Sequence, residues 1–111
     1  MAAATAGFKI NQGGGMSVVA QGLVTLNFAN TVAGATSAGL AVDTITGAVL
    51  LPSDKILVQE AGTPTAGQLF SGAYLSATSF TAYFHNITAG AVDPASAVYQ
   101  FQVLRFNVNT V

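Results

Sequence analysis

The clearest signal along the chain is an alternation of apolar and polar positions with a period of two. Between Val18 and Phe28 the even-numbered residues are apolar or glycine, while the odd-numbered set includes Gln21, Thr25 and Asn27. Successive side chains of an extended strand point to opposite faces, so this segment is predicted to be a strand whose even-numbered face meets a core.

The same period recurs in three later segments, at about 40–46, 55–60 and 80–85. The segment 68–77 is predicted to hold one or two short strands. In the sharpest case three apolar residues are predicted to face inward and three others outward: Phe80, Ala82 and Phe84 against Thr81, Tyr83 and His85.

The last strand, from residue 97 or 98 to about 108, changes phase along its length. Tyr99, Phe101 and Val103 are odd-numbered, whereas Leu104 and Phe106 are even-numbered. A shift of one residue moves every later side chain to the other face, so a bulge, or a strand that contributes to two sheets, is expected here.

The segments between these strands are rich in Gly, Thr, Ser, Pro and Asn, and none shows a helical period with caps. The pattern therefore predicts an all-β fold: a single small β-sandwich or jelly-roll-like barrel over residues 16–111. Residues 1–15 read as an extended N-terminal arm, in which Phe8, Lys9 and Ile10 form a sticky patch before a run of three glycines. The arm either folds back onto its own domain or docks on a partner.

Composition changes the picture mainly through charge. Only 6% of residues are charged, against about 25% in ordinary soluble domains, and the formal net charge is -1. So little charge gives weak repulsion between copies, which favours a surface covered by other copies or by a larger assembly. The alternative is a monomer kept soluble by neutral Thr, Ser and Asn side chains.

The same composition argues against several kinds of partner. Three cations cannot neutralise a phosphate track, so no nucleic-acid partner is expected. The uncharged run from Ile10 to Val42 is interrupted by Asn, Gln and Gly, so no membrane partner is expected. The chain has no cysteine, which excludes disulfides and thiolate metal sites.

Residues capable of catalysis are few. The single histidine, His85, is expected to be exposed beside Tyr83, and no Gly-x-Ser-x-Gly elbow is present. The four acids are well separated in sequence, so neither a metal site nor a cofactor is expected, and the chain is predicted not to be an enzyme.

The remaining polar signals are structural. Asp93-Pro94 and Asp54 are predicted to hold tight turns, and the Asn86-Ile87-Thr88 sequon is interpreted as turn chemistry. Arg105 either pairs with an acid across a sheet or points at a partner's carboxylate.

The stretch from Asn86 through Asp93-Pro94 to Ser96, followed by Tyr99-x-Phe101-x-Val103-x-Arg105, resembles a pattern in small tailed-bacteriophage virion proteins. Those sequences also carry Gly-Asp before an apolar strand and Gly-Ala-Tyr in the next one. Here Ser53-Asp54 and Gly72-Ala73-Tyr74 stand in these places, with Ser53 instead of the glycine. The resemblance covers roughly residues 40–106.

The resemblance implies a capsid decoration (cement) protein on the exterior of the virion. Its partners would be the major capsid protein and further copies of itself in a homotrimer. The partner-binding residues are predicted to be Phe8, Lys9, Ile10, Tyr83 and His85. The alternative is a head-fibre or tail-associated module that binds a receptor or glycan, with sugar rings stacked on exposed Tyr74, Tyr83 and Tyr99.

Overall fold

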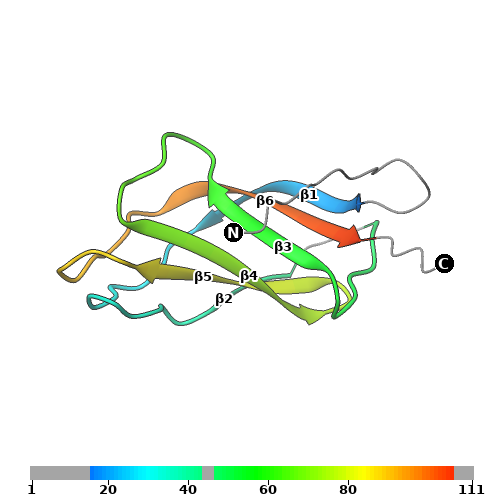
Figure 1. The fold of residues 1–111 in the computed structure, drawn as a ribbon. Helices are drawn as coiled ribbons and strands as arrows, with labels where there is room; N and C mark the ends of the chain where they lie inside the picture. Colours follow the sequence, from blue (N-terminus) through cyan, green and yellow to red (C-terminus); the bar gives the residue numbers. More distant parts are fainter. Residues whose placement is uncertain (1–15, 44–46, 107–111) are drawn as a thin grey trace, which may run out of the picture.

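A computed structural model describes residues 16–43 and 47–106 of the chain. In these residues six strands form two three-stranded antiparallel sheets that pack face to face (Figure 1). The strands are β1 (Met16–Leu26), β2 (Leu40–Val42), β3 (Lys55–Glu60), β4 (Gln68–Ser76), β5 (Ser79–Asn86) and β6 (Ala97–Phe106). The predicted all-β fold is confirmed, and it takes the form of a sandwich.

The strand order is β1-β6-β3 in one sheet and β2-β5-β4 in the other. Figure 1 shows the first sheet as the upper layer and the second as the lower layer. The chain passes from one sheet to the other at every connection except the β4–β5 hairpin. Strands distant in sequence, such as β1 and β6, therefore become neighbours.

Between the sheets lies a single apolar core. Its centre is a cluster of four rings, in which Phe28 lies 5.5 Å from Tyr99 and 5.7 Å from Phe70 between centroids, and 6.1 Å from Phe84. The other buried members come from five of the strands, β4 excepted, and from the segment before β3: Leu26, Val42, Leu50, Ile56, Val58, Phe80, Ala82, Phe101 and Val103.

Alternation predicted the inward face of β5 correctly, and β3 alternates between buried and exposed residues. Ile56 and Val58 are buried while Leu57 is exposed, and Phe80, Ala82 and Phe84 are all completely buried. The predicted segment 68–77 is the single strand β4. Where a strand lies between a core and solvent, the period of two is sufficient to assign its faces.

The close packing of β3 against β4 depends on Gly72. A Cβ atom at Gly72 would collide with Cγ2 of Ile56 in the opposite sheet and lie 3.0 Å from its Cβ. Glycine at this position lets the β4 backbone approach β3.

In β1 the predicted even-numbered inward face holds only from Ala20 onward. Val18 is 52% exposed, and the register with β6 shifts between Val18 and Ala20. Val19 instead packs against the core. A bulge at this point adds one residue to β1 and reverses the faces on either side of it.

The bulge or two-sheet strand predicted for β6 is wrong. β6 belongs to one sheet only, and its pairing with β3 runs without a shift from Tyr99 to Leu104. The extra residue lies in β1, opposite Val103 and Leu104. The phase change in the sequence therefore indicated the correct position along the sheet, but the bulge is in β1 and not in β6.

The turn after β5 is built around the buried side chain of Asn86. Its Nδ2 donates to Thr31 O (2.8 Å) and Gly90 O (2.7 Å), and its Oδ1 accepts from Thr88 N (2.9 Å). Asn86 is 1% exposed, so the sequon is turn chemistry as interpreted. The tight turn predicted at Asp93 is wrong: that segment has no regular turn, and Pro94 is buried.

Candidate functional site

Two of the predicted partner-binding residues, Tyr83 and His85, lie on the outer face of β5. They alternate with buried residues in the strand, and both are half-buried. The other three predicted residues, Phe8, Lys9 and Ile10, lie outside the described residues. The structure therefore places only part of the predicted partner-binding set.

His85 differs from the exposed histidine expected, because both of its ring nitrogens have hydrogen-bond partners. Its Nδ1 lies 2.9 Å from the Thr36 hydroxyl, and its Nε2 lies 2.7 Å from the Ser71 hydroxyl. Thr36 comes from the β1–β2 connection and Ser71 from β4. His85 thus joins three segments that are far apart in sequence.

A serine hydroxyl next to Nε2 of a histidine is also found in hydrolytic triads, where these two residues are two of the three members. In such triads a buried carboxylate on Nδ1 holds the ring tautomer and stabilises the imidazolium formed during catalysis. Here a neutral hydroxyl, Thr36, occupies that position. A hydroxyl can either donate or accept, so the arrangement suits joining segments better than activating Ser71.

Tyr83 is partly covered by the segment before β2. A Cβ atom at Gly39 would lie 3.0 Å from Cε1 of Tyr83, so only glycine lets the backbone pass this close. Tyr83 is therefore half-buried and not a freely exposed ring.

The other two aromatic candidates for stacking on a sugar are also covered. Tyr99 is 1% exposed, which makes the expectation of an exposed ring wrong at that position. Tyr74 is half-buried and packs against the core. The tyrosines thus contribute to the core more than to a surface.

A partly buried ion pair joins Arg105 of β6, whose side chain is 32% exposed, to the buried Asp54, the residue before β3. The Nε of Arg105 donates to Oδ1 and its Nη2 to Oδ2 of Asp54, both at 2.8 Å. Nη2 also donates to Val49 O at 2.8 Å, and Asp54 Oδ2 accepts from Leu51 N at 2.8 Å. Of the two roles expected for Arg105, the structure shows the internal pair, and Asp54 holds its turn as predicted.

This pair makes stability depend on pH. The hydrogen bonds from Arg105 lower the pKa of Asp54 below 3.8, against an opposing effect of burial, with help from Leu51 N. A carboxyl with a lowered pKa stabilises the fold above its unfolded pKa, and this stabilisation is lost as pH falls through the folded pKa. Unfolding free energy should therefore fall below about pH 4.

The variant Arg105→Met tests this expectation. It removes the main cause of the lowered pKa and leaves the carboxylate of Asp54 without its cation. Urea unfolding should show the largest difference from wild type at neutral pH, shrinking as pH falls below about 4. A difference that stays constant from neutral to acid pH would show that the pair is not linked to this titration.

The outer faces of both sheets are nearly free of formal charge. On the β1-β6-β3 sheet, exposed leucines alternate with amides, and Leu23 is 68% and Leu57 50% exposed. The only charged residue on this face is Lys55, at the start of β3. The other outward residues of the two faces include no Asp, Glu, Lys or Arg: Gln21, Thr25, Gln59, Val98, Gln100, Gln102, Ala41, Leu69, Ser71, Ala73, Leu75, Thr81, Tyr83 and His85.

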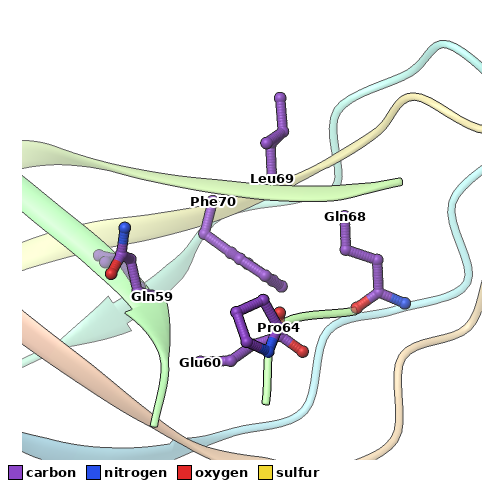
Figure 2. Close-up of a pocket in the computed structure, with 7 residues that line it drawn as sticks. Gln59, Glu60, Pro64, Gln68, Leu69 and Phe70 are labelled. Atoms are coloured by element: carbon purple, nitrogen blue, oxygen red, sulfur yellow. The ribbon is translucent and has the colours of Figure 1, made fainter. Parts of the chain in front are cut away.

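A pocket of about 220 Å³ lies between the end of β3 and the start of β4. Figure 2 shows Phe70 pointing toward Pro64 and Glu60, with Gln68 on the same side of β4 and Leu69 pointing away. Sequence reasoning missed this pocket. Its lining residues all lie within 58–70, and they enclose a pocket because the 61–67 connection crosses from one sheet to the other.

The described residues contain no group of three or more His, Cys, Asp or Glu side chains that could hold a metal ion. Within residues 16–43 and 47–106, no helix is long and apolar enough to cross a membrane. Comparison with protein-family models, curated proteins and solved structures found no match for this chain. Its function must therefore be argued from its surfaces.

Proposed function

We propose that this protein is a bacteriophage capsid decoration protein that binds the outside of the major capsid shell and stabilises it, acting as a homotrimer. The main support is the neutrality of both sheet faces, where large exposed leucines lie among amides and hydroxyls. The cores of protein interfaces are depleted in charge in the same way. The resemblance of the segment 86–105 to small virion proteins supports a phage capsid as the assembly to which the protein binds.

The physical role would follow from differential binding. A protein that binds only the assembled, mature shell adds buried area across subunit junctions and stabilises that state by mass action. A neutral surface suits this role because no charges must be stripped of water on docking. The sandwich itself, built on a continuous ring-filled core, supplies a rigid platform for these faces.

The proposal is tested on virions of a phage that encodes this chain. Purified virions should contain it in hundreds of copies, and virions lacking it should lose heat resistance that is regained when purified protein is added. Failure of the purified protein to sediment with mature capsids would contradict the proposal.

The receptor- or glycan-binding alternative stays a prediction with weaker support. The aromatic residues that it relied on are buried or half-buried, Tyr99 above all. Copy number separates the two functions, because a fibre or tail-tip protein would be present in three to a dozen copies per virion, on the order expected for symmetric appendages.

A further inference from the structure

The pocket between β3 and β4 has the size of a side-chain site. At about 220 Å³ it lies below the roughly 300–1,000 Å³ of small-molecule pockets. Its floor is apolar, with Phe70, Val58 and Pro64 among the lining residues, and its polar groups come from Gln59, Glu60 and Gln68. One long side chain with an apolar stem and a polar head matches this lining.

The polar head is specified by the charge of Glu60. Its Oε1 accepts from Thr65 N and its Oε2 from the Thr65 hydroxyl, each at 2.9 Å. A carboxylate has about four acceptor sites, so both oxygens can take a further donor. Thr65 thus orients the carboxylate without neutralising it.

No cation of the described residues pairs with Glu60. The ion pair found in residues 16–43 and 47–106 joins Arg105 to Asp54, near the other end of β3. The charge of Glu60 also affects Tyr99, its partner on β6. Burial is the main cause that raises the pKa of Tyr99, and the negative charge of Glu60 is the second. The pocket therefore combines an apolar floor with an uncompensated negative charge.

The chain offers three cations to such a site. Arg105 is held by Asp54 and Val49, and Lys55 lies at the opposite end of β3. Lys9 remains, and it stands between Phe8 and Ile10 in the sequence. An apolar–cation–apolar segment complements the pocket in both charge and hydrophobicity.

The strand register decides whether this segment reaches its own pocket. Met16 pairs with Phe106, and Glu60 pairs with Tyr99, so the two lie seven positions apart along β6 and two strands apart across the sheet. This separation is roughly 25 Å. Lys9 is seven residues before Met16, and a fully extended chain of that length spans at most about 25 Å.

The main chain could thus bring Lys9 to its own pocket only when almost fully extended along a straight path across the sheet. A neighbouring copy imposes no such limit. We propose that the Glu60 pocket binds the Phe8-Lys9-Ile10 segment of a second copy of this chain. The inference rests on the self-association in the proposed function and names the contact that produces it.

This contact is heterologous, because a segment of one copy meets a different surface of the next. Heterologous contacts close into rings when the rotation between copies allows it. A three-membered ring would give the homotrimer proposed above, with each copy contributing one segment and one pocket.

The test is sedimentation velocity of the full chain with reversed charges. Lys9→Glu and Glu60→Lys should each weaken association about tenfold or more, because each places like charges together. The double variant should recover most of the association. Mixing the two single variants should recover part of it, since the reversed segment then meets a reversed pocket on another copy.

Two further variants guard against trivial causes. Lys55→Glu reverses an exposed lysine on the same strand and should leave association unchanged. Glu60→Gln keeps an acceptor for Thr65 while removing the charge, so it should weaken association without lowering the unfolding midpoint in urea.

The possible failures are distinguishable. A wild-type protein that stays monomeric at every concentration would overturn this inference together with the trimer of the proposed function. Association that is unaffected by either charge reversal would overturn the pocket contact and leave self-association standing. If association recovered in the double variant but not in the mixture of single variants, the segment and the pocket would meet within one copy, which would contradict the inference.

Discussion

Replacing Phe28 with alanine should destabilise the protein by about 3–5 kcal/mol, the range typical of a large aromatic residue removed from a core. Phe28 is 1% exposed, and its ring contacts those of Phe70, Phe84 and Tyr99. Phe28 lies just beyond the end of β1, and the rings that it contacts come from both sheets. Alanine would leave a cavity that these neighbours cannot fill without leaving their own positions.

Urea unfolding at neutral pH measures this effect as a lower midpoint with an unchanged slope. The matched control is Phe106→Ala, which removes the same atoms from a side chain that is 52% exposed. It should cost about 0.5 kcal/mol or less, as surface substitutions usually do. Equal losses for the two variants would mean that Phe28 is not part of the core. Because small domains are stable by only about 5–15 kcal/mol, Phe28→Ala is also expected to lower yield and solubility.

Asn86→Ala should have the next largest effect, a loss of about 2–4 kcal/mol, since a buried group left without a partner costs about 1–3 kcal/mol. The substitution leaves Thr88 N without an acceptor and removes one donor each from Thr31 O and Gly90 O. Thr31 O keeps the bond from Val92 N, and Gly90 O keeps the bond from the Thr88 hydroxyl, which limits the loss.

The control for Asn86 is Asn30→Ala, an exposed asparagine in the β1–β2 connection that Asn86 anchors through Thr31. Its unfolding free energy should stay within about 0.5 kcal/mol of wild type. Hydrogen exchange adds a second measurement: the amides of Thr31 and Val92, which bond to each other across the two connections, should exchange faster in Asn86→Ala. Unchanged protection there would argue against Asn86 as the anchor.

The sandwich was predictable because its strands separate a core from solvent. In β5 apolar residues alternate with more polar ones, so the inward face of Phe84 follows from spacing alone. Turn chemistry was predictable where the reason is local. Asn86 and Asp54 each bond to backbone groups within four residues of themselves.

Prediction failed where the answer depended on a partner strand. The phase change near Val103 is visible in β6, but whether the extra residue belongs to β6 or to its neighbour is a property of the pairing, and it lies at Val19 of β1. Tyr99 looked like a surface residue because tyrosine has a polar end, yet the rings of Phe28 and Phe70 enclose it. In both cases the decisive contacts come from residues far away in the chain.

In the candidate site too, some properties were predictable from the sequence and others depended on the tertiary structure. Composition alone established that this is a nearly uncharged β-rich chain with few residues for catalysis, since these properties do not depend on how the strands are arranged. The contacts of the candidate site depend instead on how the strands pair and pack. Arg105 forms an ion pair with Asp54, and both ring nitrogens of His85 lie next to hydroxyl groups. Glu60 lies beside an apolar pocket, and no cation of the described residues pairs with it. The reason is that hydrogen bonds and ion pairs act over a few ångströms, and only the packing of the two sheets brings such distant residues that close.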